Sequence, residues 1–360
     1  MSNRMDKLVI DGEIWLPAGK KILDGRLVVH EGIIEAVGER SDIILPDDCK
    51  HQVYDQGEKL LPGFVEPHCH LGIYEEITGA DRLNLKDILV APDFKIIDQI
   101  NFEDIGFKEA AFSGGVTTAC ILPGSAALIG GVGAIVKTTG PDRVVEFEHA
   151  LKLSLGENVE KPFGHSASQL KERLWQEFAN STSKNISKSL KRELTVRAHC
   201  HRKEDIEIFL ELAKCFDLDL SLEHATEGGA LSGMISDIGV SLVAGPFFVG
   251  RPKKEMAGLN RFLLAEMVAE DILVSFMSDY PSNPPDMLRY ALLDAIKYGV
   301  DEGKALDLIT VNGARILGLE NRVGSLETGK EADIVVHSHS PFEPKDRILE
   351  VYIKGELCSW

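Results

Sequence analysis

Two histidines separated by one residue, His68 and His70, stand at the end of the apolar segment LLPGFVEPHCH. In a β-strand, residues two positions apart point to the same side, so both imidazoles would face one centre while Cys69 packs behind them. Neutral imidazole is a good ligand for a divalent metal of borderline softness. The pair alone is also found in ordinary surface strands, but its place at the carboxyl end of an apolar run favours a metal site.

Three further residues of metal-binding type close later apolar runs: His199 in LTVRAHCH, His224 in LSLEHATEG and Asp279 in ILVSFMSDYP. His201 repeats the spacing but already turns toward the next helix. We therefore predict His199 as a ligand, with His201 beside the substrate or behind the ligands. A lone histidine is more often a core residue, and an aspartate before Tyr-Pro often caps a turn or helix. The joint order favours a metal centre in which Asp279 also moves a proton.

Eight apolar runs in the middle of the chain end in small or polar residues and alternate with helical patterns. The runs cover residues 60–70, 115–124, 133–140, 150–157, 194–201, 220–228, 239–247 and 272–281, and the last is followed by predicted helices at 285–300 and 301–318. Repeated strand–helix units with short links predict a parallel sheet. Eight strands favour an α/β fold with a closed (β/α)8 barrel, whose chemistry lies at the carboxyl ends of its strands.

Both ends of the chain are rich in short β-type runs separated by Asp-Gly, Glu-Gly, Gln-Gly and Lys-Gly turns. We predict that they form one composite β-sandwich domain, residues 1–61 and 327–360, beside a barrel domain of residues 62–326. Two unrelated decorations are the alternative. His337 and His339 lie in this terminal region, and we expect a solvated strand there rather than a second metal site.

The amino-acid composition limits the classes of partner that the protein can bind. The formal net charge of −18 excludes a basic face for nucleic acid and disfavours docking on anionic membranes. The sequence contains no run of ~18 consecutive apolar residues, so we predict no membrane-spanning helix. The six cysteines are scattered without a CxxC pair, and no apolar leader is visible, so we expect a reduced, cytoplasmic protein acting on a small molecule. Cys120 and Cys200 lie inside apolar runs and are predicted to pack in the core.

These segments together resemble the amidohydrolase superfamily, and within it the imidazolonepropionase-like branch. LLPGFVEPHCHLG is similar to the motif of the first barrel strand, and SGGVTTACILPGSAALIGGVGAIVKT to the segment of the second. VRAHCHRKEDI, LEHATEG, GPFFVGRPKKE and MSDYP follow in the family's order. ILGLENRVGSLETGKEADIVV resembles the return into a small β domain. The resemblance covers essentially the whole chain.

The resemblance implies a (β/α)8 barrel that binds a divalent metal, typically Zn²⁺, as one or two ions. His68 and His70 would bind it from strand one, His199 from strand five, His224 from strand six and Asp279 from strand eight. A homo-oligomer such as a dimer is a reasonable expectation for this branch.

Lys152, in LKLSLGEN, resembles the lysine-bearing segment of the branch. In this superfamily such a lysine is often carboxylated and bridges two metals, whereas an ordinary salt-bridged lysine or a substrate contact is the alternative. The number of ions therefore stays open. Tyr280 stands where many relatives have histidine, and the segment before LTVRAH is shorter than in the branch. The substrate therefore cannot be transferred by analogy.

The predicted activity is metal-dependent hydrolysis of a C–N bond in an amide, a cyclic amide or a similar group, rather than in a peptide. Asp279 would carry the proton from the attacking water to the leaving nitrogen, and His224 or His201 would stabilise the oxyanion. A ring-amine deaminase, a dipeptidase-like peptidase and a non-catalytic barrel are the alternatives. Arg251, Lys253 and Lys254 in RPKKE either begin a helix in solvent or bind a substrate carboxylate.

Overall fold

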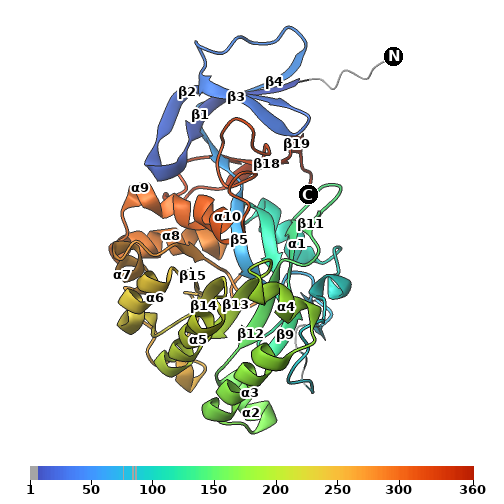
Figure 1. The fold of residues 1–360 in the computed structure, drawn as a ribbon. Helices are drawn as coiled ribbons and strands as arrows, with labels where there is room; N and C mark the ends of the chain where they lie inside the picture. The colour runs from blue at the N-terminus through green and yellow to red at the C-terminus, as the bar shows by residue number, and fades with distance from the viewer. Residues whose placement is uncertain (1–6, 76, 83–84, 86) are drawn as a thin grey trace.

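The computed structural model describes residues 7–75, 77–82, 85 and 87–360 (Figure 1). The first six residues of the predicted terminal domain lie outside the described residues. The larger sheets contain seven, six and four strands, and a fourth sheet is a two-stranded ribbon of β6 (Tyr74–Glu75) and β7 (Ala80–Asp81). Strands from the two ends of the chain lie together at one end of the molecule, as the blue and dark red strands of Figure 1 show.

The seven-stranded sheet is composed of both terminal segments, in the order β19-β18-β17-β4-β1-β2-β3. Its strands are β1 (Lys7–Trp15), β2 (Lys21–His30), β3 (Ile33–Glu39), β4 (Cys49–Pro62), β17 (Ile334–His337), β18 (Ile348–Ile353) and β19 (Glu356–Leu357). Strand β4 joins the two halves, because it pairs in parallel with β1 and antiparallel with β17. Ile10 and Ile14 point to one face of β1 and pack in a buried cluster with Leu27, Leu60 and Ile334.

A buried aspartate, Asp11, ties the first strands of this sheet together. Its carboxylate accepts two hydrogen bonds from the Arg26 guanidinium, each of 2.7 Å, and lies 2.8 Å from His51 Nε2. Burial alone would raise the pKa of Asp11. The bonds from Arg26 and His51 outweigh it and lower the pKa below 3.8.

Replacing Asp11 with asparagine is expected to lower the free energy of unfolding at neutral pH by about 1–3 kcal/mol, because a charged hydrogen-bond acceptor is lost. The wild-type advantage is complete above the unfolded pKa and is lost as the pH falls through the lower folded pKa. Urea unfolding from pH 7 into the acid range measures it. Asp24→Asn, on an exposed side chain, is the control. Parallel pH profiles for wild type and Asp11→Asn would contradict the expectation.

The central strands form two sheets with the orders β11-β10-β8-β5 and β16-β15-β14-β13-β12-β9. They are β5 (Phe64–Cys69), β8 (Val116–Ile121), β9 (Ile129–Val132), β10 (Ala134–Lys137), β11 (Val144–Glu146), β12 (Ala150–Ser154), β13 (Thr195–Cys200), β14 (Leu220–His224), β15 (Ser241–Ala244) and β16 (Val274–Phe276). Each of the eight predicted runs contains a strand. Strands β12 to β16 pair in parallel, as do β5 and β8.

One predicted parallel strand is wrong. The run at 133–140 forms β10, which pairs antiparallel with β8, and β9 pairs antiparallel with β12. A parallel pair needs a crossover connection of a dozen or more residues, usually a helix. The link between β8 and β10 contains β9 and no helix, so the chain folds back instead.

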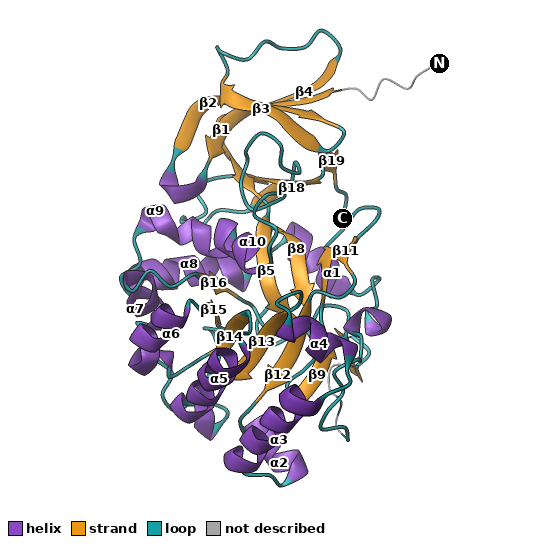
Figure 2. Ribbon diagram, in the orientation of Figure 1, coloured by secondary structure: helices purple, strands orange, loops and turns teal. Residues whose placement is uncertain are grey.

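Helices flank the central strands, as the purple ribbons of Figure 2 show. They are α1 (Ile105–Phe112), α2 (Glu157–Phe163), α3 (Ala167–Asn180), α4 (Lys184–Leu190), α5 (Lys203–Phe216), α6 (Ser232–Ile238), α7 (Leu263–Ala269), α8 (Met287–Lys297), α9 (Glu302–Ala305) and α10 (Val311–Ile316), with short 3₁₀ turns η1 (Pro17–Gly19), η2 (Ile96–Gln99), η3 (Gly228–Leu231), η4 (Lys254–Met256) and η5 (Leu306–Ile309). The region predicted as one helix at 301–318 forms α9, η5 and α10, and Thr310, whose backbone is non-helical within a β-branched stretch, separates η5 from α10. No described helix is both long and apolar enough to cross a lipid bilayer.

The buried core agrees with the prediction for Cys120 and Cys200, which are fully buried. The prediction of a solvated strand at His337 is wrong. His337 is fully buried, its Nδ1 lies 2.7 Å from Asp346 Oδ2, and its ring lies 5.7 Å from that of Phe64. The reason is that β17 is an interior strand, paired on both edges.

Candidate metal centre

The residues predicted to carry chemistry come together in one cavity of about 610 Å³ at the carboxyl ends of the central strands. They come from five strands and the turns that follow them. The cavity is lined by His68, His70, Lys152, His199, His201, His224 and Asp279. Residues distant in the sequence thus share one centre, as the barrel prediction requires.

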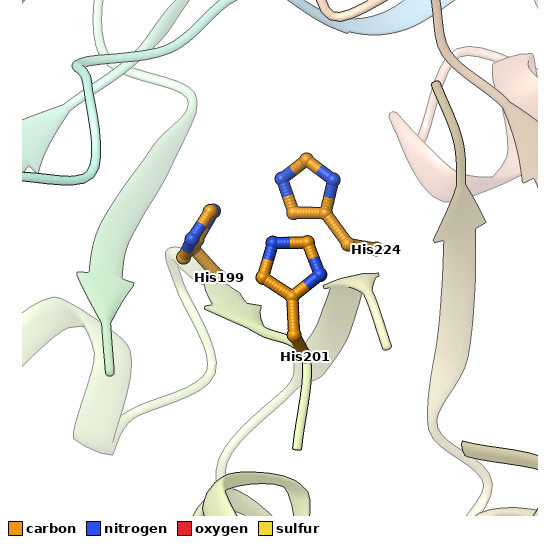
Figure 3. A group of neighbouring side chains, drawn as sticks. All are labelled: His199, His201 and His224. Atoms are coloured by element: carbon orange, nitrogen blue, oxygen red, sulfur yellow. The ribbon is translucent and has the colours of Figure 1, made fainter. Parts of the chain in front are cut away.

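Three of the histidines face one another, as Figure 3 shows. His199, His201 and His224 each offer a ring nitrogen, and these atoms lie within 4.8 Å of one another. The ring of His224 lies 4.5 Å from that of His199 and 4.7 Å from that of His201. His199 Nε2 is buried and has no hydrogen-bond partner among the described residues. A metal ion would satisfy this nitrogen, so the donor set fits a bound cation.

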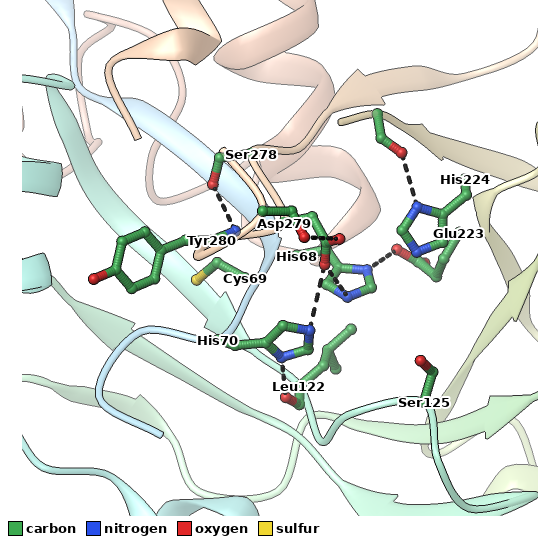
Figure 4. Close-up of polar contacts among 12 residues, drawn as sticks. His68, Cys69, His70, Leu122, Ser125, Glu223, His224, Ser278, Asp279 and Tyr280 are labelled. Atoms are coloured by element: carbon green, nitrogen blue, oxygen red, sulfur yellow. Dashed lines mark hydrogen bonds and ion pairs between the residues drawn. The ribbon is translucent and has the colours of Figure 1, made fainter. Parts of the chain in front are cut away.

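A second group overlaps the first, because His224 belongs to both. His68, His224 and Asp279 also place one ligand atom each within 4.8 Å. Asp279 Oδ1 lies 3.3 Å from His70 Nε2 and 3.7 Å from His68 Nε2 (Figure 4). Asp279 therefore stands between the histidines of β5 and the histidine that ends β14, where a carboxylate can share an ion with imidazoles.

Hydrogen bonds behind the cavity fix the orientation of these rings through their Nδ1 atoms. The bonds join His68 to Glu223 Oε2 at 2.7 Å, His70 to the Leu122 carbonyl at 2.8 Å, His224 to the Gly245 carbonyl at 2.8 Å and His201 to Thr226 Oγ1 at 2.6 Å. An imidazole that donates through Nδ1 has its lone pair at Nε2. The acceptors at His68, His70 and His224 therefore prepare these three rings as ligands, whereas the Thr226 hydroxyl can also donate to His201.

The backbone turns sharply at two of the candidate ligands. His224 and Asp279 have positive φ values of 66° and 53°, which are uncommon for residues with a side chain and cluster at functional sites. Strand alternation alone would place Glu223 and His224 on opposite faces. The turn at His224 ends the strand, and both side chains then meet His68 or its neighbours.

Two residues behind the site were missed by sequence reasoning. Arg197 and Glu223 are fully buried, and Arg197 donates to both oxygens of Glu223 at 2.5 and 3.0 Å and to the Pro67 carbonyl at 2.9 Å. Glu223 in turn holds His68. A signal existed, because Arg197 lies two residues before His199 and so shares its face of β13.

Burial keeps the histidines neutral. Burial is the largest cause of the lowered pKa values of these imidazoles, and nearby lysines lower them further, whereas the charge of Asp279 opposes the shift at His68, His201 and His224. The affected residues are His68, His199, His201 and His224. Neutral imidazole is the form that binds metals, so the electrostatics suit a ligand set.

Lys152 and Asp279 complete the electrostatics of the centre. Burial lowers the pKa of Lys152 to about 8, and its Nζ lies 3.4 Å from His68 Nε2. The negative charges of Glu223 and Asp279 oppose this shift. Burial would raise the pKa of Asp279, but the adjacent His70 ring holds it well below its usual range. Asp279 is therefore ionised at neutral pH, which is the form of a carboxylate that binds a metal.

The remaining residues of the predicted site lie partly in the cavity wall and partly outside it. Of the three basic residues in RPKKE, only Lys253 lines the cavity. Arg251 donates to the Leu259 carbonyl at 3.1 Å, and Lys254 is exposed. Tyr280, which follows Asp279, is buried.

Comparison with known proteins gives one consistent family. The profile of the amidohydrolase family matches residues 60–358. Amidohydrolase tasK of Hapsidospora irregularis is 24% identical over 92% of this chain, but the chain spans only 39% of the length of that protein. An imidazolonepropionase of Thermoanaerobacter pseudethanolicus is 24% identical over 88% of this chain and 84% of its own.

A solved structure agrees with these relatives. The amidohydrolase of Thermotoga maritima MSB8 superposes with a TM-score of 0.87 at 30% identity, covering 97% of this chain and 99% of its own. This likeness implies the TIM-barrel type of fold that the alternating strands and helices predict. The chain belongs to the amidohydrolase family, in its imidazolonepropionase-like branch.

Proposed function

We propose that this protein is a metal-dependent hydrolase that cleaves a C–N bond in an amide, a cyclic amide or a similar small molecule. The observation that carries the proposal is the buried Nε2 of His199, which has no hydrogen-bond partner among the described residues and lies in a group of three histidines that shares His224 with the group of His68 and Asp279. Family membership supports the same class of reaction.

The residues that would hold the metal are His68, His70, His199, His224 and Asp279, and Lys152 would join them in a centre with two ions. We propose Zn²⁺, because imidazole nitrogens and one carboxylate suit it. A bound ion of this kind supplies Lewis acidity, which polarises a carbonyl group and makes a neighbouring water more acidic.

The chain's own groups then move the proton and stabilise charge. Asp279, held ionised beside His70, would accept the proton of the attacking water at a carboxylate oxygen and deliver it to the leaving nitrogen. Thr226 Oγ1 can donate to His201 Nδ1, which leaves an N–H at His201 Nε2 that faces the cavity and would stabilise the oxyanion. His224, whose Nδ1 donates to the Gly245 carbonyl, would help through the ion that it holds.

The molecular setting of this activity is also proposed. We infer that the two central sheets close into a (β/α)8 barrel of residues 62–326, because β16 lies against β5. Residues 1–61 and 327–360 would form the composite β-sandwich domain beside it. All six cysteines are free thiols, which supports a reducing, cytoplasmic compartment. Assembly into a homo-oligomer stays a prediction.

Metal binding is the first test. Protein stripped with a chelator is expected to gain about 2.7 kcal/mol of stability at a free Zn²⁺ concentration 100 times the dissociation constant, because the ion binds only the folded chain. Thermal unfolding across a zinc titration measures the gain, and elemental analysis counts ions per chain in wild type and Lys152→Met.

His199→Ala should abolish most of the gain in stability. His339→Ala, outside the centre, should leave it intact, and an equal gain in both variants would contradict the assignment.

Product analysis tests the reaction class. Metal-loaded protein is incubated with cyclic amides, N-acyl amino acids, ring amines and dipeptides. Ring opening or release of an acyl group supports the proposal. Ammonia released from a ring carbon would instead identify a deaminase, and two amino acids from one dipeptide a peptidase. Metal-bound protein that cleaves none of these C–N bonds would favour a non-catalytic barrel.

A further inference from the structure

One cation in the cavity wall takes no part in the metal centre. Lys253 lies in the loop after β15 and lines the cavity with its side chain 29% exposed. A lysine of this length normally extends its charged end into water. A neighbouring residue must therefore hold the ammonium group of Lys253 in the cavity wall.

Glu255 is that residue. Its side chain is fully buried, and its Oε1 lies 3.4 Å from Lys253 Nζ. Its Oε2 accepts the backbone N–H of Glu157 at 2.7 Å, and Glu157 Oε1 accepts the backbone N–H of Glu255 at 3.0 Å. This reciprocal pair joins the loops after β12 and β15. Gly156 leaves room for it, since a Cβ there would come within 2.3 Å of Glu255 Oε2 and its φ is 98°.

Glu255 holds the lysine as an ion-pair partner without a hydrogen bond, since Glu255 Oε1 has no hydrogen-bond partner among the described residues. The three donors of the Lys253 ammonium group can therefore all meet an incoming acceptor. Glu255 itself does not line the cavity, so an incoming molecule meets the cation. A second lysine, Lys161 of α2, also lines the cavity and pairs with Glu157. The chain as a whole has a net charge of −18, so two lysines in the wall of one cavity differ from its overall charge.

Lys253 also lies close to His201, one of the residues proposed to act on the substrate. Glu255 Oε1, which binds Lys253, lies 4.0 Å from His201 Nε2. A group bound by Lys253 is therefore separated by a short linker from a bond that reacts beside His201 and His224. In a long substrate, a carboxylate farther from the reacting bond would lie beyond Lys253.

We propose that the substrate is anionic, with a carboxylate a few bonds from the scissile C–N bond, and that Lys253 binds this carboxylate. The proposal rests on the proposed hydrolase function for the identity of the reacting bond. Lys253 then selects N-acyl amino acids and carboxylated cyclic amides over their neutral counterparts.

The test measures binding without turnover. Levulinate and benzoylpropionate are ketone isosteres of N-acetylglycine and N-benzoylglycine that contain no C–N bond. Their affinities for the zinc-loaded protein are measured by calorimetry beside those of the corresponding neutral alcohols and primary amines. The wild type should bind the carboxylates at least about 10-fold more tightly than the alcohols. Lys253→Met should reduce this preference by about 10- to 100-fold, the usual effect of losing a charged hydrogen bond.

Two further variants make the result decisive. Lys253→Arg should restore most of the preference, and Lys254→Met, on the exposed neighbouring lysine, should leave it unchanged. Absence of a carboxylate preference in the wild type, its survival in Lys253→Met, or tighter binding of the amines would overturn the proposal. Selective carboxylate binding by a protein that hydrolyses no amide would overturn the proposed function and leave the carboxylate site standing.

Discussion

Asp279→Asn is expected to reduce kcat by about 10²- to 10⁴-fold while most of the metal stays bound, because the amide keeps an oxygen ligand but cannot accept a proton. Asp279 lies 3.3 Å from His70 Nε2 and 3.7 Å from His68 Nε2, so no other carboxylate of the two groups can replace it. Steady-state kinetics on a cleaved amide, with zinc content measured on the same sample, provides the measurement.

Asp81 offers a matched control for this variant, because it lines the same cavity outside both ligand groups. Asp81→Asn should change kcat far less than Asp279→Asn. Full turnover by metal-loaded Asp279→Asn would refute the proton-transfer role. Loss of both turnover and metal would instead make Asp279 a ligand first and leave its acid–base role without support.

Removing the buried guanidinium behind the site is expected to have the largest effect on stability. Arg197→Met leaves the fully buried Glu223 carboxylate without its cationic partner, with only the hydrogen bond from His68, and breaking one side of a buried ion pair costs about 3–5 kcal/mol. Urea unfolding of the metal-free protein measures this loss directly, without the contribution of the ion.

A surface pair and a double variant separate charge burial from packing. Lys171→Met breaks an exposed pair with Glu211 and should cost at most about 1 kcal/mol. Arg197→Met combined with Glu223→Leu should recover much of the loss, because neither charge of the pair is then left buried without the other. A double variant as unstable as Arg197→Met alone would show that the shape of the side chains, rather than their charge, dominates.

The sequence predicted the candidate ligands because each stands where an apolar run stops. His68, His199, His224 and Asp279 interrupt hydrophobic strands with polar side chains, and parallel strands bring their carboxyl ends to one edge. The alternation of strands and helices is a local pattern, so the elements themselves were accessible. Their convergence in one cavity followed from topology.

What was missed depends on long-range contacts. Glu223 and Arg197 matter through each other and through His68, which lies far away in the sequence. For His201 the sequence left two positions open, beside the substrate or behind the ligands, and only the fold places its ring in the cavity wall, 4.7 Å from that of His224. His337 sits in a polar sequence and is buried only because two distant strands cover it. No local periodicity reports such neighbours.

The pairing of β4 with both β1 and β17 has a consequence for biosynthesis. The edge of β4 that receives β17 stays open until residues beyond Ile334 leave the ribosome, about 270 residues after β4 itself. At about 5–20 residues per second this interval lasts roughly tens of seconds. During translation the nascent N-terminal strands therefore present an unsatisfied edge that a chaperone must shield or a neighbouring nascent chain can capture.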